Sequence, residues 1–298
     1  MPAFSFRHRI LGLTAALAIT ACTGPEAAAP AAAAVDDFGD TLRTGATPTR
    51  VVSLNPATTD IVFAIGAGPR LVGRTSWDLR DDSVRAVPDL GPGLRPNVEA
   101  VLAARPDLVL LYAGEDNRAA ARALRAAGIA TLSLRIDRIA DFRRATRLVG
   151  AALGDSVRAR HVVDSVDATL DRVRRATAGL PRRTTFWRVW ERPLLTIGGG
   201  SYLTELVTIA GGRNIYDSLP QASPQVAMED VVRRNPDVIL TSPDGAGKFM
   251  TTSAWRAVPA VRDGRVLIVD TTLVGRPSVR LGEAAVSLAR LLHPDVRP

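Results

Sequence analysis

The sequence predicts an α/β protein of two lobes, each built on a parallel sheet, joined by a single long α-helix. Two observations predict the lobes. Short apolar strands alternate with amphipathic helices, and the motifs of residues 48–150 recur in the same order in residues 184–298. A third observation predicts the connection, because the longest uninterrupted helical pattern, residues 155–178, separates the two halves.

Length and composition are those of an ordinary globular protein. The chain has 298 residues, of which 46% are hydrophobic and 23% are charged. A folded body of about 250 residues buries about three quarters of its unfolded surface, so the core needs no disulfides. Cys22 is the only cysteine and the three histidines are scattered, which excludes a cysteine metal site and a histidine-rich metal cage.

Residues 1–22 have the pattern of an export signal. Positively charged residues 7–9 precede an apolar run, residues 10–19, that is shorter than the roughly 20 residues of a bilayer span. The run ends in Leu-Ala-Ile-Thr-Ala-Cys, which resembles the lipobox of bacterial lipoproteins, so Cys22 is expected to be lipidated and to anchor the protein in a membrane. An ordinary signal peptide with an incidental cysteine is the alternative. We expect the protein to work in the periplasm or on the extracytoplasmic face of a membrane.

A tether and the first lobe follow the signal. Residues 23–47 are rich in Ala and Pro and are expected to form a flexible tether. The first lobe is expected to contain strands at residues 50–54, 71–73, 108–112 and 131–134, and helices after Asn55-Pro56 and at residues 99–104 and 117–127. Thr58 or Thr59 is expected to cap the first of these helices, with Asp60 in its first turn, where a carboxylate favours the helix dipole.

The bridging helix is expected over residues 155–178. Val162, Val166, Leu170 and Val173 form an apolar stripe at helical spacing, and Arg and Asp occupy the other faces. At 1.5 Å per residue the helix would be roughly 36 Å long, which is enough to cross from one lobe to the other. A single stiff helix predicts limited hinge motion between the lobes.

The second lobe, residues 184–298, repeats the order of the first, and we expect both lobes to be Rossmann-like. The clearest repeat places Glu99 and Glu229 each seven residues before a Pro-Asp pair and an apolar strand. The other expected elements are a capped helix from Ser201 to a Gly-Gly stop, a strand at residues 266–269 and a helix at residues 283–292.

The sequence gives little support for catalysis. His161 lies within the expected long helix and His293 near the end of the chain, so neither is a convincing general base. Residues 198–201, Gly-Gly-Gly-Ser, could cradle a phosphate but lack a following lysine, so a plain tight turn is favoured. We therefore expect no enzyme activity, and an extracytoplasmic hydrolase that uses this turn is the less favoured alternative.

The formal charge of +8 raises the question of anionic partners. It is carried almost wholly by arginines that are spread along amphipathic helices among acidic residues, which favours a solvated surface, so no nucleic-acid partner is expected. A basic lipoprotein that binds anionic polymers remains an alternative, and it predicts a steep dependence of binding on salt.

Three aromatic residues lie where a ligand of two facing lobes would bind. Trp77 and Trp190 follow expected strands, and Tyr202 lies at the start of an expected helix. Ligands of open α/β sheets bind beyond the carboxyl ends of the strands, so two facing lobes would bring these residues to a common cleft. The alternative is that Trp77 and Trp190 are half-buried packing residues.

Three sets of motifs resemble those of a known family. They are Arg-Val-Val-Ser-Leu-Asn-Pro-Ala-Thr-Thr-Asp at residues 50–60, Asn-Val-Glu and Arg-Pro-Asp-Leu-Val within residues 97–109, and the matching segment from Pro-Gln-Val to Asp at residues 224–237. Together they resemble the periplasmic substrate-binding proteins of ABC importers for cobalamin, haem and ferric siderophores. The resemblance implies a monomer of two α/β lobes that serves an ABC permease and its ATPase. It also implies that Glu99 and Glu229 dock onto arginines of the permease, one from each lobe.

Within this family, the chain is most similar to the cobalamin-binding branch. The similarity lies in Trp-Glu-Arg-Pro at residues 190–193 and Ser-Pro-Gln-Val at residues 223–226, whereas the loop at residues 90–96 departs from that branch and has no tryptophan. A corrinoid is therefore the expected ligand. No cofactor of the protein's own is expected, with cobalt or iron present only as part of the ligand.

The residues expected to bind this ligand are Trp77, Trp190, Tyr202, Arg276 and Arg280. Ferric siderophores and haem are the alternative ligands. Anionic ferric siderophores are commonly met by arginines, for which Arg276 and Arg280 are the candidates. Haem needs an axial ligand such as a tyrosine, for which Tyr202 and Tyr112 are the candidates.

Overall fold

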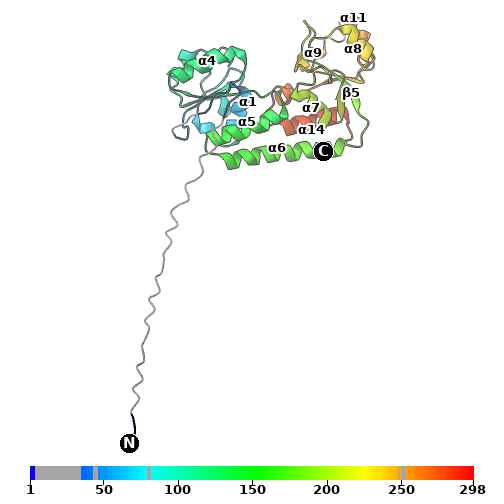
Figure 1. Ribbon diagram of the computed structural model, residues 1–298. Coiled ribbons are helices and arrows are strands. Elements are labelled where there is room, and N and C mark those ends of the chain that lie inside the picture. The colour runs from blue at the N-terminus through cyan, green and yellow to red at the C-terminus, as the bar shows by residue number, and fades with distance from the viewer. Residues whose placement is uncertain (4–34, 43–45, 79–81, 248, 250–252) are drawn as a thin grey trace. The chain divides into compact units, whose positions relative to one another are not determined.

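The computed structural model describes residues 1–3, 35–42, 46–78, 82–247, 249 and 253–298, and within it residues 34–298 form one compact unit (Figure 1). The predicted signal sequence, apart from its first three residues, lies outside the described residues. Cys22 and the first part of the predicted tether also lie outside them.

The first lobe contains a parallel sheet flanked by helices. Its described elements are β1 (Val51–Leu54), α1 (Pro56–Ala64), η1 (Gly68–Arg70), β2 (Leu71–Gly73), α2 (Asp82–Arg85), α3 (Val98–Ala103), β3 (Leu108–Tyr112), α4 (Glu115–Ala126), β4 (Ala130–Leu134) and α5 (Ile139–Ala152). The strand order is β2-β1-β3-β4, and every neighbouring pair is parallel. All four residues of β1 are buried, as expected for a central strand covered on both faces.

The first helix begins earlier than predicted. Asn55, and neither Thr58 nor Thr59, is its N-cap, and the Asn55 Oδ1 accepts a hydrogen bond from the Ala57 amide at 3.0 Å. Pro56 is suited to the first helical position, because it has no N–H to satisfy and its φ is already helical. Thr58 and Thr59 are buried within the helix and their hydroxyls bond to Ser53 and to the Asn55 carbonyl. The predicted cap was therefore wrong by three or four residues.

The second lobe repeats this architecture. Its described elements are β5 (Arg183–Arg188), α7 (Tyr202–Ile209), β6 (Gly212–Asn214), α8 (Met228–Arg234), β7 (Val238–Thr241), α9 (Pro243–Ala246), α11 (Ser253–Arg256), α12 (Pro259–Arg262), β8 (Val266–Ile268), α13 (Thr271–Val274) and α14 (Leu281–Leu292). The strand order, β6-β5-β7-β8, matches that of the first lobe, and the strands are again parallel. The predicted fold of two similar α/β lobes is confirmed.

The repeated Pro-Asp pair has a structural role in both lobes. Asp107 Oδ2 accepts hydrogen bonds from the Thr49 amide at 2.7 Å and the Thr49 hydroxyl at 3.0 Å. Asp237 Oδ2 accepts the same two bonds from Thr184, at 2.7 and 2.8 Å. Each aspartate thus fixes the start of the central strand against the start of its neighbour, which explains why the motif occurs twice.

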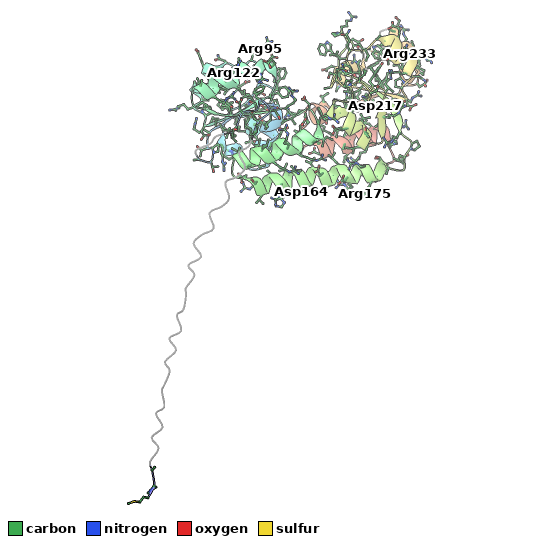
Figure 2. All side chains as sticks on the ribbon, in the orientation of Figure 1. Arg95, Arg122, Asp164, Arg175, Asp217 and Arg233 are labelled. Atoms are coloured by element: carbon green, nitrogen blue, oxygen red, sulfur yellow. The ribbon has the colours of Figure 1, made fainter. Side chains whose placement is uncertain are left out.

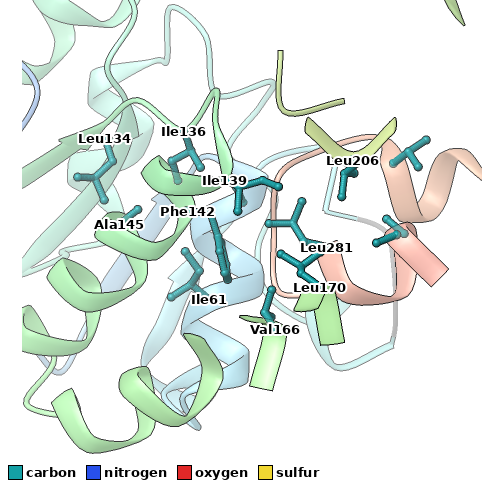
Figure 3. Close-up of a cluster of buried hydrophobic side chains, with 14 of the residues drawn as sticks. Ile61, Leu134, Ile136, Ile139, Phe142, Ala145, Val166, Leu170, Leu206 and Leu281 are labelled. Carbon is teal, nitrogen blue, oxygen red and sulfur yellow. The ribbon is translucent and has the colours of Figure 1, made fainter. Parts of the chain in front are cut away.

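The helix α6 (Ser156–Thr177) joins the lobes, and its observed ends agree with the prediction to within one residue. Along one face it packs against α1 and α5 of the first lobe and against α7 and α14 of the second (Figure 1). Its buried Val166 and Leu170 belong to a hydrophobic cluster with Phe142 of α5, Leu206 of α7 and Leu281 of α14 (Figure 3). One apolar core therefore runs through both lobes.

Residues 35–42 correct the predicted tether, because they pack on the first lobe. Val35 and Thr41 form an antiparallel bridge, and the Asp37 amide donates to the carbonyl of Ser133 on the edge strand β4 at 2.9 Å. The buried carboxylate of Asp36 accepts a hydrogen bond from the Ser133 amide at 3.0 Å. This segment covers a strand edge that would otherwise expose unpaired backbone groups. The folded body thus begins before residue 48.

Removing the Asp36 carboxylate should destabilise the fold. In Asp36→Ala, the Ser133, Phe38 and Asp40 amides lose their acceptor, and bonds to a buried charged acceptor contribute about 1.5–3 kcal/mol each, so we expect a loss of about 2 kcal/mol or more. Urea unfolding of residues 23–298 measures this. Asp82→Ala, which removes a fully exposed carboxylate, is the control and should leave the midpoint unchanged. Equal midpoints for the two variants would contradict the docking of residues 35–42.

Candidate functional site

A cavity of about 850 Å³ lies between the two lobes, within the size range of sites for small molecules and cofactors. Its lining residues are Asn55, Pro56, Ala57, Trp77, Arg85, Tyr112, Ile136, Thr271, Thr272, Gly275, Arg276, Pro277 and Arg280. The first-lobe residues include those at and after the carboxyl ends of β1, β2 and β3. Those of the second lobe lie in α13, which follows β8, and in the loop between α13 and α14. This is the position at which parallel α/β sheets bind ligands.

Trp77 lines the cavity, as predicted, and its side chain is open to solvent, with the residue 66% exposed. Hydrogen bonds to Asp78 hold the loop that carries Trp77 in place. The buried Asp78 accepts hydrogen bonds from the Thr75 amide at 3.0 Å and the Thr75 hydroxyl at 2.7 Å, and Thr59 donates to the same oxygen at 3.2 Å. An exposed indole on a rigid loop can contact a ligand with little loss of conformational entropy.

Asp78 is a buried carboxyl group beneath this loop. Burial raises its pKa, although the hydrogen bonds from Thr75 and Thr59 and the positive charge of Arg276 act in the opposite direction. Among the residues that the structure describes, its buried Oδ1 atom has no hydrogen-bond partner, which is consistent with the cost of burying the charged form.

Two tyrosines near the cavity have their hydroxyls engaged by protein acceptors. Tyr112 lines the cavity and donates to Asp137 at 2.9 Å, and burial together with this carboxylate raises the pKa of Tyr112 to about 12. Tyr202 is not among the lining residues. Its hydroxyl donates to the Val274 carbonyl at 2.5 Å, and burial raises its pKa further than that of Tyr112. Both phenols are therefore neutral at physiological pH.

Both predicted arginines line the cavity, and each is paired with a carboxylate. Arg276 bonds to Asp60 of α1 in the other lobe, with Nε to Oδ2 at 2.8 Å and Nη2 to Oδ1 at 3.1 Å. Arg280 bonds to Glu283 Oε2 through Nε at 3.0 Å and Nη2 at 2.7 Å. Asp60, expected only to favour its helix dipole, is buried and holds a partner 216 residues away.

Trp190 is exposed, at 62%, but the structure does not bring it into the lining of this cavity. Its Nε1 donates to the Arg192 carbonyl at 3.1 Å, and its backbone pairs with Leu195 in a short antiparallel bridge. Trp190 is thus not half-buried packing, and its role as a ligand contact stays a prediction.

Several lining residues were not predicted from the sequence, among them Asn55, Arg85, Thr271 and Thr272. A positional signal existed for three of them. Asn55 directly follows β1, and the two threonines follow β8, so the rule that ligands bind beyond the carboxyl ends of strands would have selected them. Arg85 lies on the short helix α2, for which the sequence carried no signal.

Residues 217–222 pack against the glycine-rich turn at residues 198–201. The amides of Gly198 and Gly199 donate to the carbonyls of Ala222 and Leu219, at 3.1 and 2.7 Å. A Cβ at either glycine would lie 2.2 Å from a backbone oxygen of the segment opposite. Close approach of two backbone segments explains these glycines, and the two amides that could have cradled a phosphate are already satisfied. The geometry therefore gives the hydrolase alternative no support.

Glu99 and Glu229 occupy equivalent positions, one in each lobe. Each lies in the first turn of its helix, α3 or α8, and each side chain is exposed. The structure thus presents one accessible carboxylate per lobe at related sites of the repeat.

Comparison with known proteins places the chain in a family. The family model described as periplasmic binding protein matches residues 51–273. A Bacillus subtilis protein named as an uncharacterised ABC transporter substrate-binding lipoprotein, YvrC, is 28% identical over 256 residues, covering 83% of this chain and 81% of that protein. The vitamin B12-binding protein of Yersinia pestis is 31% identical over 197 residues, covering 65% of this chain and 69% of that protein.

Solved structures support the fold. The periplasmic haem-binding protein RhuT from Roseiflexus, in its apo form, superposes with a TM-score of 0.74 at 23% identity, covering 82% of this chain and 98% of that chain. A haem-binding protein thus shares the fold with this chain, so the fold by itself does not choose the ligand.

No helix in the part of the chain that the structure describes is long and apolar enough to span a membrane. The family match covers most of both lobes and the cavity-lining residues from Asn55 to Thr272, whereas the lining residues 275–280 lie after its end. Members of this family are transport proteins rather than enzymes. The chain therefore belongs to the periplasmic binding protein family, and it is a substrate-binding protein of the ABC importer type.

Proposed function

We propose that this protein captures a cobalamin-like corrinoid in the cavity between its lobes and delivers it to an ABC permease and its ATPase. The observation that carries the proposal is the large cavity with the exposed Trp77 on a rigid loop at its wall. A corrinoid is large and amphipathic, so an indole face suits its ring, and Arg280 with Thr271 and Thr272 offers polar groups to its amide side chains. Trp190 and Tyr202 remain predicted contacts.

The pairing of the side chains favours a corrinoid over the alternative ligands. An axial haem tyrosine has to give up its proton to bind iron, whereas the pKa values of Tyr112 and Tyr202 are raised and both hydroxyls already donate to protein oxygens. An anionic siderophore needs available cationic groups, whereas Arg276 and Arg280 are each paired with a carboxylate and the third lining arginine, Arg85, lies 3.6 Å from Asp82. A neutral or nearly neutral ligand suits this lining best.

The direct test is titration of residues 23–298, by calorimetry and visible absorption, with cyanocobalamin, cobinamide, haemin and a ferric siderophore. We expect saturable one-to-one binding of a corrinoid, with a rise in melting temperature as binding to the folded state requires. Tight binding of haemin or the siderophore, with no response to either corrinoid, would contradict the proposed ligand and leave the importer family intact.

Substitution of the two exposed tryptophans tests the site. Trp77→Ala should weaken corrinoid binding about tenfold or more, because an aromatic contact is worth about 1–2 kcal/mol and tenfold in affinity is about 1.4 kcal/mol. Trp190→Ala removes a similarly exposed indole outside the cavity lining and should weaken binding less. Melting temperatures of both variants should match the parent. A larger loss with Trp190→Ala would move the binding surface away from this cavity.

Glu99 and Glu229 are proposed as the permease-docking residues. The double variant Glu99→Ala/Glu229→Ala should bind corrinoid as tightly as the parent but abolish ATP-driven uptake into vesicles that hold the permease and ATPase, because paired carboxylates supply register to a transient partner. Asp164→Ala/Asp171→Ala removes two other exposed acids of α6, of which Figure 2 labels Asp164, and is the matched control. Uptake that survives the glutamate variant, or falls equally in both, would refute this docking assignment.

Cys22 is proposed as the lipid anchor, on the strength of the lipobox-like pattern before it. Acyl chains on this cysteine would hold the protein at the membrane surface near the permease. In cells, Cys22→Ser should move the mature protein from the membrane fraction to the soluble fraction. Unchanged membrane association of the serine variant would disprove the anchor.

A further inference from the structure

Arg276 lines the cavity, but its guanidinium is directed to the opposite lobe. It lies just after α13 of the second lobe and bonds to Asp60 of α1 in the first lobe through two parallel hydrogen bonds, of 2.8 and 3.1 Å. This is the bidentate geometry that makes arginine–carboxylate pairs directional as well as attractive. The Asp60 side chain is 4% exposed and that of Arg276 is 27% exposed, so the pair is largely shielded from solvent.

The surroundings favour the charged form of Arg276. Burial alone would lower the pKa of Arg276, but the hydrogen bond to Asp60 and the negative charges of Asp60 and Asp78 outweigh it, and the pKa is raised. The positive charge of Arg276 also acts on Asp78, beneath the Trp77 loop, so the guanidinium interacts electrostatically with two carboxyl groups. An ion pair in this setting is costly to break, because the largely buried groups would lose their two mutual hydrogen bonds.

Other contacts join the lobes at a different place. The Tyr202 amide at the start of α7 donates to the Asp137 carbonyl at 3.0 Å, and Arg138 forms an ion pair with Glu205. Of these residues, none lines the cavity. The contact between Arg276 and Asp60 differs from these contacts. Arg276 forms part of the cavity wall, and Asp60 is a buried residue of α1.

We propose that the Arg276–Asp60 pair is an interlobe clamp that sets the separation of the two cavity walls before any ligand binds. Arg276 then acts as a positioning residue, and its effect on the ligand passes through the distance between the lobes. A preformed cavity lowers the entropic cost of binding and slows escape of the ligand. The clamp itself is a property of the ligand-free protein; only its effect on affinity rests on the proposed function.

The alternative is that Arg276 is a direct ligand contact, as the sequence analysis predicted. The two roles differ in what they require of Asp60. A ligand anion that took over the guanidinium would deprive the buried Asp60 carboxylate of its bidentate bonds to Arg276, whereas a clamp keeps these bonds intact in the complex. Asp60 does not line the cavity, so its substitution reports on the clamp alone.

The first experiment measures the interlobe distance without ligand. Residues 23–298 contain no cysteine, so Arg122→Cys on α4 and Arg233→Cys on α8 provide two exposed sites for spin labels, one on each lobe (Figure 2). The distance between the two labels is measured by pulsed electron–electron double resonance. Asp60→Asn and Arg276→Gln should each broaden the distance distribution and raise its mean to the same extent. The double variant should match either single variant, because each single variant already removes the same interlobe ion pair.

Arg280→Gln is the matched control, since Arg280 lines the same cavity but its partner Glu283 lies in its own lobe. It should leave the distribution unchanged. If Asp60→Asn or Arg276→Gln proves too unstable to label, Arg276→Lys is used instead. Lysine keeps the positive charge but lacks the planar guanidinium that makes two parallel hydrogen bonds, so this variant should broaden the distribution less. The clamp is overturned if folded Asp60→Asn, Arg276→Gln and Arg276→Lys all give the same distance distribution as the parent.

The second experiment measures cyanocobalamin binding by the same variants. A clamp predicts that Asp60→Asn and Arg276→Gln each accelerate dissociation about tenfold, and that the double variant is no worse than either. A loss confined to Arg276→Gln, with Asp60→Asn binding like the parent, would make Arg276 a ligand contact and overturn its positioning role. If the parent does not bind cyanocobalamin, the proposed ligand fails, and the distance measurement alone decides the clamp.

Discussion

The rest of this structure depends on the burial of one face of α6 against both lobes. Leu170 and Val166 pack into a core that also holds Phe142 from the first lobe and Leu281 from the second. Because apolar burial stabilises in proportion to the area removed from water, neither lobe can lose its contact with α6 without exposing part of its own core. The long helix therefore does more than connect two bodies. It makes them share one interior, which restricts how far the carboxyl ends of the two sheets can separate.

The site follows from this constraint. Parallel strands direct their carboxyl ends to one edge of each sheet, and α6 holds the two lobes so that loops from both edges line a single cavity. The chain then places a rigid loop with an open indole, Trp77, on one wall and two arginines on the other. Both arginines are paired with carboxylates, and the third lining arginine, Arg85, lies 3.6 Å from Asp82, which is why we propose an amphipathic, nearly neutral ligand rather than an anion.

Periodicity and caps predicted the architecture because they are local properties of the chain. The stripe through Val166 and Leu170 located α6, and the repeated Pro-Asp pair revealed the two lobes even though its structural role became clear only from the Thr49–Asp107 bonds. Three of the five predicted ligand residues, Trp77, Arg276 and Arg280, lie in the cavity wall, whereas Trp190 and Tyr202 do not. The pairing of Asp60 with Arg276 spans 216 residues, and the docking of Asp36 on Ser133 spans 97, so no local pattern could have shown either.

A crystal structure of residues 23–298 with cyanocobalamin is the most direct test of the central claim, that a corrinoid occupies a cavity whose walls are already in place. The account predicts that the corrin lies between the lobes against Trp77, with the two hydrogen bonds between Arg276 and Asp60 preserved. Density for the corrinoid outside this cavity, or an Arg276 that has left Asp60 to bind the ligand, would contradict it.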